Sequence, residues 1–246
     1  MALNEETAGA AKSLAKDAQI RRLKAELDAL RRFVPSVVRE AIAGDPFRPM
    51  LERQSRDLSV LFMDIAGCTR LCELLTPPRM QELIEGYFSS FIDEVHELGG
   101  VINETAGDGL MILFLDGGPR EHARAAVRAA SVIHGRTENF AACWGEECQE
   151  LAVHAGINSG AASLGVMEFR GRREVRATYT ASGPVANVAA RLAAIAPRGK
   201  TWAAKETWQR TKRFFGSAYV GRFELKNVGQ PVEVYELRPD SPEVDA

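Results

Sequence analysis

Two aspartates occupy positions from which a folded chain could bring their carboxylates together. Asp64 ends the apolar run LSVLFMDI, which has the composition of a short buried strand, and Asp108 lies in the AGDG turn between two β-type runs. Two such carboxylates repel each other unless a cation lies between them. Mg²⁺ suits this arrangement because it takes few protein ligands, mostly oxygens, and completes its shell with substrate and water. The spacing indicates a metal site, and two solvated turn residues are the alternative interpretation.

The periodicity of apolar residues predicts the elements that would position these aspartates. We expect helices at 78–98, 120–137, 183–196 and 203–212, a surface loop from 138 to 150, and strands at 58–65, 101–106, 109–115, 151–160, 161–169, 173–180, 223–228 and 232–237. Mixed helices and strands with hairpins predict an α/β sandwich in which helices cover one sheet.

Length and composition limit the class of protein. The chain has 246 residues, 31 Lys+Arg against 33 Asp+Glu, a net charge of -2 and 46% apolar residues, as expected of one globular core domain with an appendage. This balance argues against a nucleic-acid binder that works by neutralising phosphates. No apolar run reaches the roughly 18 residues of a membrane helix, and the first residues lack a secretory apolar region, so we expect a soluble, cytoplasmic protein.

The four cysteines are too few and too irregularly spaced for a disulfide framework. They are Cys68, Cys72, Cys143 and Cys148. We interpret Cys143 and Cys148 as two reduced thiols in a loop, with pairing or metal binding by these two as the alternative.

The N-terminal residues predict a helical signalling segment at 1–45. Its apolar residues alternate spacings of three and four, which is a heptad pattern of about two repeats: Ile20, Leu23, Leu27, Leu30 and Val34. Parallel dimerisation as a short coiled coil is our interpretation, and packing onto the chain's own domain is the rival. Residues 46–56 are expected to form a linker, 57–238 the main domain, and 239–246 a disordered tail.

Five stretches resemble the class III nucleotidyl cyclase catalytic domain, in order from about Leu58 to Leu237. FMDIAGCTR resembles its strand-turn motif Phe-x-Asp-Ile-x-Gly-Phe-Thr, and ETAGDGLMILF its second metal hairpin. HAGINSGAASLG is similar to its glycine-bearing strand pair. TYTASGPVANVAARL resembles its Gly-x-x-x-Asn-x-x-x-Arg helix, and FELKNVGQPVEVYEL its closing strands. The sequence is therefore identified as a member of this family.

The resemblance implies a ferredoxin-like β-α-β core with extra strands, which dimerises head to tail so that two composite sites form at the interface. In each site Asp64, Asp108 and the backbone carbonyl of Ile65 from one subunit are implied to hold two divalent metals, Mg²⁺ or Mn²⁺. The implied reaction converts a nucleoside triphosphate to a 3′,5′-cyclic nucleotide and pyrophosphate.

The resemblance also implies that the partner subunit supplies the groups that bind the substrate's ribose and phosphates. Arg191 is a planar cation suited to the α-phosphoryl oxygens, Lys226 a point charge for the outer phosphates, and Asn187 a neutral amide that orients the ribose. The i, i+4 spacing of Asn187 and Arg191 places both on one helical face. A salt bridge, a solvated strand end and a surface amide are the alternative interpretations of these three residues.

The base-reading positions of the family hold Glu104 and Thr180 here, a mixed pair. A carboxylate at 104 accepts from guanine N1–H and N2–H₂, and a threonine hydroxyl donates to O6, so the pair favours GTP. Adenine would set its N1 lone pair against the carboxylate. An adenylate cyclase that ignores Glu104, a pyrimidine nucleotide cyclase and a catalytically silent nucleotide-binding domain remain alternatives.

Three positions depart from the family pattern. Cys68 replaces the usual aromatic residue of the metal loop, and Pro184 and Ala186 replace the usual residues after Gly183. Proline is compatible with the first helical turn. The basic run from Phe169 to Arg176 lies where the family has a protruding arm, and a solvated hairpin is our interpretation of it.

Overall fold

The chain forms two compact units in this computed structural model, Met1–Met50 and Leu51–Ala246. The structure describes residues 2–49, 51–145, 148 and 150–238. The expected tail at 239–246 lies outside the described residues. No helix in these ranges combines the length and apolarity needed to cross a membrane.

The first unit is helical. It contains α1 (Ala2–Leu30), the 3₁₀ turn η1 (Arg31–Phe33) and α2 (Ser36–Gly44). The break falls at Val34, whose extended backbone (φ −122°, ψ 129°) is the conformation favoured before Pro35. The apolar side chains of the heptad pattern are 40 to 62% exposed on α1. The predicted helix is confirmed, and its dimerisation stays a prediction.

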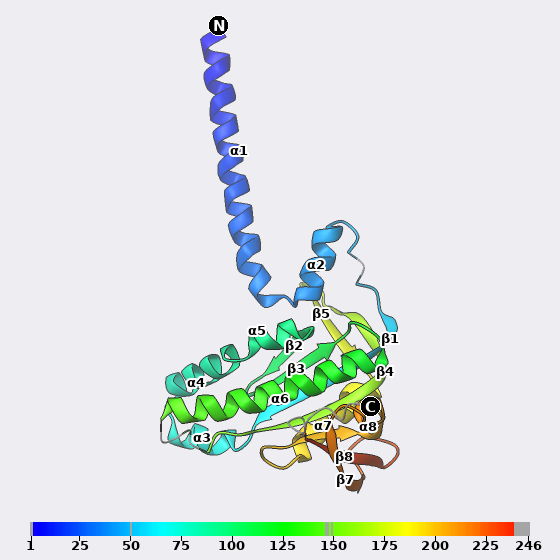
Figure 1. The fold of residues 1–246 in the computed structure, drawn as a ribbon. Helices are drawn as coiled ribbons and strands as arrows, with labels where there is room; N and C mark the ends of the chain where they lie inside the picture. Colours follow the sequence, from blue (N-terminus) through cyan, green and yellow to red (C-terminus); the bar gives the residue numbers. More distant parts are fainter. Residues whose placement is uncertain (1, 50, 146–147, 149, 239–246) are drawn as a thin grey trace. The chain divides into compact units, whose positions relative to one another are not determined.

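The second unit is built on one mixed sheet (Figure 1). Its strands are β1 (Gln54–Ile65), β2 (Gly100–Ala106), β3 (Gly109–Phe114), β4 (Val153–Arg170), β5 (Val175–Ser182), β6 (Thr201–Ala204), β7 (Gly216–Phe223) and β8 (Val232–Arg238). Their order is β2-β3-β1-β4-β6-β8-β7, with β5 paired to β4. The first four positions have the antiparallel ferredoxin-like arrangement, which confirms the predicted core with extra strands.

Helices pack on both faces of the central strands. They are α3 (Cys68–Leu74), α4 (Pro77–Ser89), α5 (Ile92–Glu97), α6 (Pro119–Trp144), α7 (Pro184–Ile195) and α8 (Lys205–Thr211). Side chains alternate along a strand, so Leu61 and Met63 of β1 pack in the core beneath α6, which crosses the sheet in Figure 1. On the other face, α7 lies so close to Gly156 of β4 that a Cβ there would be 2.2 Å from the Ala189 carbonyl oxygen.

Several element boundaries differ from the sequence prediction. The expected helix at 78–98 is divided between α4 and α5, where the Ser90 hydroxyl donates to the Tyr87 carbonyl at 2.6 Å. The expected loop after residue 137 is helical as far as Trp144, whose ring stacks on Phe140. Trp144 also contacts the guanidinium of Arg79 on α4, so tertiary packing extends this helix.

The strand predictions were wrong at two places. The two strands expected at 151–160 and 161–169 are one strand, β4, which begins at Val153. Gly160 and Gly165 adopt positive φ angles of 144° and 149° and let this single strand bend. The strand expected at 223–228 ends at Phe223, since a turn closes from the Val228 N–H to the Leu225 carbonyl. The short strand β6 was not expected at all.

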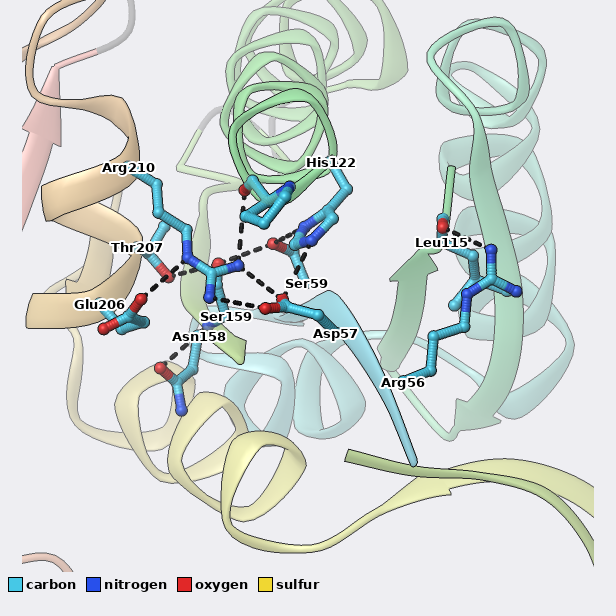
Figure 2. A network of polar contacts seen from close by, with 11 residues as sticks. Arg56, Asp57, Ser59, Leu115, His122, Asn158, Ser159, Glu206, Thr207 and Arg210 are labelled. Carbon is cyan, nitrogen blue, oxygen red and sulfur yellow. Dashed lines mark hydrogen bonds and ion pairs between the residues drawn. The ribbon is translucent and has the colours of Figure 1, made fainter. Parts of the chain in front are cut away.

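A chain of buried hydroxyls fastens α6 and α8 to the sheet (Figure 2). Ser59 Oγ on β1 lies 2.8 Å from His122 Nδ1 on α6 and 2.6 Å from Ser159 Oγ on β4. Ser159 Oγ lies 2.9 Å from Thr207 Oγ1 on α8. All four side chains are at most 3% exposed, so these contacts satisfy polar groups that would otherwise be buried without partners.

Asp57 is the charged end of this network. Arg210 of α8 donates to both of its carboxylate oxygens, at 2.6 and 3.1 Å, and also donates to Glu206 at 3.0 Å. His122 Nε2 lies 3.1 Å from Asp57 Oδ1, outside hydrogen-bond geometry. The hydrogen bond from Arg210 lowers the pKa of Asp57, whereas burial lowers the pKa of His122 against the opposing charge of Asp57.

The buried histidine makes the stability of the domain depend on pH. The unfolded chain binds a proton at His122 below about pH 6.5, but the folded protein keeps this ring neutral to lower pH. The free energy of unfolding should therefore decrease as pH falls below about 6.5, because the unfolded state binds more protons in that window. Urea unfolding followed between about pH 7.5 and 5.5 measures the slope.

His122→Asn should flatten this slope, because the titrating group is gone. His96→Asn, at an exposed position of α5, is the matched control and should keep the wild-type slope. Equal slopes in the wild type and the His122→Asn variant would show that the pH dependence arises elsewhere.

Candidate active site

The fold brings the two aspartates of the sequence motifs together. Asp64 lies at the end of β1, and Asp108 lies in the turn between β2 and β3. Asp64 and Gly109 form the last residue pair of the ladder between β1 and β3. Directly beyond this pair, the Ile65 N–H donates to the Asp108 carbonyl at 3.3 Å. Burial raises the pKa of Asp64, the negative charge of Asp108 raises it further, and His154 opposes both. The two carboxylates are therefore close enough to repel.

A glycine makes room for this pair. A Cβ on Gly109 would lie 2.0 Å from Asp64 Oδ1 and 3.1 Å from its Cγ, far inside van der Waals contact. Gly109 is buried, and it is the cross-strand partner of Asp64 on β3. Any larger residue there would force the Asp64 carboxylate out of its present position.

The helix after β1 places a thiol against the second carboxylate. The turn at Gly67 (φ 78°) follows the hydrogen bond from the Ala66 N–H to the Ala152 carbonyl at 2.8 Å. α3 then begins with Cys68, whose thiol is a neighbour of the Asp108 carboxylate. Burial raises the pKa of the Cys68 thiol, and the neighbouring carboxylate adds to this effect. The sequence marked Cys68 only as a departure from the family pattern.

The donor set at this pair fits a divalent cation. The charge of Asp108 raises the pKa of Asp64, and a cation bound at this pair would relieve the repulsion. The carbonyl of Ile65, between Asp64 and the turn, would supply a third oxygen. Within the described ranges no three His, Cys, Asp or Glu side chains are grouped to hold a metal, so the protein's share of a coordination shell here rests on these few oxygens.

A second group of predicted residues lies on and beside α7. Val188 and Leu192 turn inward, which leaves Asn187 exposed and Arg191 half-buried on the same side of the helix. Lys226 is exposed in the loop after β7, where its neighbour Leu225 packs in the same core cluster as Val188 and Leu192. The fold thus places Lys226 next to the helix that carries Asn187 and Arg191.

The two predicted base-reading residues lie on neighbouring strands. The Asn103 side-chain amide of β2 donates to the Tyr179 carbonyl of β5 at 3.1 Å, at a bulge between Ile102 and Glu104. Glu104 follows Asn103 and is exposed. Thr180 follows Tyr179, is 9% exposed, and donates a long hydrogen bond of 3.4 Å to the Ala181 carbonyl.

The predicted residues therefore form two separate groups in one chain. Asp64 and Asp108 form the first group, and the side chains on α7, β2, β5 and the loop after β7 form the second. All of them lie in the described part of the chain, and no hydrogen bond or ion pair joins the two groups there. Within one chain, the two aspartates therefore make no direct polar contact with the other predicted site residues.

One arrangement elsewhere has the residue types of a nucleophilic triad. Ser59, His122 and Asp57 contact one another in that order (Figure 2), a constellation that the sequence analysis did not single out. Ser59 is fully buried, however, and its hydroxyl is shared with Ser159. A substrate carbonyl has no access to it, and the three residues serve the fold.

Comparison with known proteins supports the motif assignments. Residues 50–239 match the family model of the adenylate and guanylate cyclase catalytic domain. An adenylate cyclase of Anabaena cylindrica is 27% identical over 183 residues, which are 73% of this chain and 36% of that protein. An uncharacterized protein of Mycobacterium tuberculosis is 31% identical over 159 residues, 63% of this chain and 27% of that protein. The chain thus spans about a third or less of the length of these curated relatives.

Solved structures show the same fold. The adenylyl cyclase CyaB from P. aeruginosa is 27% identical, with a TM-score of 0.71 over 79% of this chain and 100% of that chain. A bacterial light-regulated adenylyl cyclase is 21% identical, with a TM-score of 0.77 over 92% of this chain and 64% of that chain. The guanylate cyclase domain of RhGC from Catenaria anguillulae is 19% identical, with a TM-score of 0.65 over 75% and 98%.

The contact between Gly109 and Asp64 predicts a specific metal-binding defect. Gly109→Ala should weaken Mn²⁺ binding about tenfold or more, the usual effect of disturbing a group that orients a metal ligand. Titration calorimetry with Mn²⁺ measures the affinity, and a thermal melt checks that the variant is folded.

Gly135→Ala is the matched control, because its Cβ would meet no atom within 4 Å and alanine is the better helix former. It should keep wild-type affinity. A folded Gly109→Ala protein with unchanged Mn²⁺ affinity would refute the assignment of Asp64 as a ligand.

Proposed function

The chain belongs to the adenylate and guanylate cyclase catalytic domain family, and on that premise we propose that it converts a nucleoside triphosphate to a 3′,5′-cyclic nucleotide and pyrophosphate. The reaction is attack of the ribose 3′-hydroxyl on the α-phosphorus, with pyrophosphate as the leaving group. The observation that carries this proposal is the position of Asp64 at the end of β1, opposite Gly109 and next to the Asp108 turn, whose carbonyl accepts from the Ile65 N–H. A cation bound at this pair of aspartates would relieve the repulsion between the two charges.

Asp64 and Asp108, with the Ile65 carbonyl, would hold two divalent cations, Mg²⁺ or Mn²⁺. When bound, these cations supply the positive charge that makes the 3′-hydroxyl more acidic and neutralises the phosphates. The two carboxylates keep the cations at the end of β1. The pairing of β1 with β3 and β4 fixes that position.

The residues on and beside α7 would bind the rest of the substrate. Arg191 is half-buried, so its guanidinium is in a position to contact the α-phosphoryl oxygens and stabilise charge that develops there. Asn187, one turn earlier on the same side, would orient the ribose. Lys226 would contact the outer phosphates as a solvent-accessible point charge. These roles come from the family motif and from the chemistry of each side chain.

We propose that a homodimer assembles each site from two chains. The metal pair of one subunit would face the α7 residues of its partner. The separation of the two residue groups within a chain supports this arrangement, since neither group alone can hold both the cations and the α-phosphoryl oxygens. Two equivalent sites would result in a symmetric dimer.

GTP is the proposed substrate because of the side chains at the base-reading positions. The Glu104 carboxylate accepts the N1–H and N2–H₂ donors of guanine, and the Thr180 hydroxyl has only a long bond of 3.4 Å to give up before donating to O6. ATP is the second candidate, because the Anabaena cylindrica relative is named an adenylate cyclase and because Thr180 can also accept from the adenine amine. The two candidates differ in what faces Glu104.

Shared sites predict that two dead variants rescue each other. Asp64→Asn removes the charge of a metal ligand, and Arg191→Ala removes the phosphate contact, so each variant alone should lose turnover. A mixture should regain part of the activity, because a mixed dimer contains one site with both defects and one with neither. Cyclic nucleotide released from GTP with Mn²⁺ measures the rescue.

Mixing Asp64→Asn with Asp108→Asn is the control for this experiment, because both defects fall in the same group and no intact site can form. Mixed dimers that form, as shown by pull-down of differently tagged chains, and remain inactive would disprove the composite site. Full activity of Asp64→Asn alone would disprove the metal assignment.

The base assignment predicts a change of substrate. Glu104→Lys replaces an acceptor with a donor, which can pair with adenine N1 but not with guanine N1–H. A charge-assisted hydrogen bond is worth about 1.5 to 3 kcal/mol, so the preference between GTP and ATP should shift towards ATP by roughly tenfold or more. The ratio of kcat/KM for the two nucleotides measures the shift.

Glu97→Lys, which reverses an exposed charge on α5, is the control and should keep the wild-type ratio. A wild type that prefers ATP, with a ratio that Glu104→Ala leaves unchanged, would show that Glu104 does not face the base.

A further inference from the structure

Two cysteines lie in one helix beside the carboxylate pair. Cys68 is the first residue of α3, and Cys72 follows it by four residues, so both are on the same face of the helix. Burial raises the pKa of the Cys68 thiol, and the neighbouring Asp108 carboxylate and Cys72 thiol raise it further. The two cysteines thus lie at the start of the helix that follows Ile65, whose N–H donates to the Asp108 carbonyl at 3.3 Å.

The pair is accessible from solvent. Cys72 is exposed and Cys68 partly exposed, and neither is in a disulfide. Cys72 also lines an open, mostly apolar hollow between α3 and α4, with Leu75, Pro77, Met80 and Ile84. A small solute can therefore reach Cys72 without passing through the core.

We propose that Cys68 and Cys72 are a modification site at which a peroxide forms a disulfide, and that this disulfide weakens cation binding by Asp64 and Asp108. The proposal rests on the proposed function, because it takes these aspartates as the cation ligands. It gives this chain a reversible redox control located at the metal loop.

The chemistry balances with hydrogen peroxide as the oxidant. The exposed Cys72 sulfur attacks one peroxide oxygen, the O–O bond breaks, and Cys72 sulfenic acid and water form. The Cys68 sulfur then attacks the Cys72 sulfur, the S–O bond breaks, and a second water leaves with the Cys68 proton. The two thiols lose two electrons in total, and the peroxide is reduced to two waters.

Helix geometry explains why this bond would disturb the site. Cβ atoms four residues apart in a helix are about 5 to 6 Å apart. A disulfide needs about 3.5 to 4.5 Å between its Cβ atoms, so the first turn of α3 must contract or unwind. α3 has seven residues, of which only Leu71 is buried, so little packing resists this change. The Cys68 sulfur would then leave Asp108, and the turn that follows Ile65 would move.

The test treats the purified chain with hydrogen peroxide and then measures two quantities. Mass spectrometry of a digest should show the Cys68 and Cys72 peptide lighter by two hydrogens. Titration calorimetry should show Mn²⁺ affinity lower by about tenfold or more, as expected when a group that positions a ligand is lost. Dithiothreitol should restore both quantities to their starting values.

Two variants separate this pair from other thiols. Cys72→Ala cannot form the bond and should keep its Mn²⁺ affinity in peroxide, whereas Cys143→Ala, at another exposed cysteine, should respond as the wild type does. A disulfide that leaves Mn²⁺ affinity unchanged, oxidation that stops at sulfinic acid, or a Cys72→Ala protein that loses affinity in peroxide would each overturn the proposal.

This readout distinguishes the inference from the proposed function. If untreated wild type binds Mn²⁺ and Asp64→Asn does not, the metal assignment stands whatever peroxide does. If untreated wild type and Asp64→Asn bind Mn²⁺ equally, the assignment of the aspartates fails, and the redox proposal fails with it.

Discussion

The repulsion between Asp64 and Asp108 sets the conditions that the surrounding structure must meet. Like charges in contact destabilise a fold by themselves, so the backbone has to hold them in place. β1 provides this support because it is hydrogen-bonded on both sides, to β3 as far as Asp64 and to β4 along its whole length. Gly109 then leaves room for the Asp64 carboxylate, because a Cβ there would lie 2.0 Å from Asp64 Oδ1. The two hydrogen-bonded ladders of β1 and the absent side chain of Gly109 together hold the Asp64 carboxylate in one position.

The alternation of side chains along β1 separates stability from chemistry. Odd-numbered residues, from Asp57 through Leu61 to Ile65, face α6, where the core cluster and the buried network lie. Even-numbered residues, including Asp64, face the side of the sheet on which α7 packs. The face beneath α6 is packed and hydrogen-bonded for rigidity, whereas the face beneath α7 combines the buried Leu58 and Val60 with Asp64 at the end of the strand. Substitutions in the network of His122 and those at Asp64 should consequently affect different properties of the protein.

The sequence predicted the parts that depend on local pattern. The apolar run before Asp64, the glycine-flanked turn at Asp108 and the amphipathic helix of Asn187 formed where their residues indicated. Long-range packing decided the remainder: α6 continues to Trp144 because Phe140 and Arg79 contact that ring, and β4 is one strand because β1 pairs along it. The contact of Cys68 with Asp108 and the network of His122 with Ser59 join residues distant in sequence. The local pattern of apolar residues carries no information about such long-range contacts, so they could be found only from the structure.

A composite site would make catalysis depend on the association of two chains. If the cations and the α7 residues come from different chains, the fraction of active sites follows the fraction of chains that are paired, and a separate dimerising segment then acts on catalysis by mass action. The first unit has the properties of such a segment: α1 is a long helix whose apolar residues from Ile20 to Leu30 are exposed within the described chain. A break at Val34 and Pro35 separates it from α2, so the two helices need not move as one rod. If the N-terminal unit dimerises as its exposed apolar residues predict, it would set how often two copies meet without any change in the fold of the second unit.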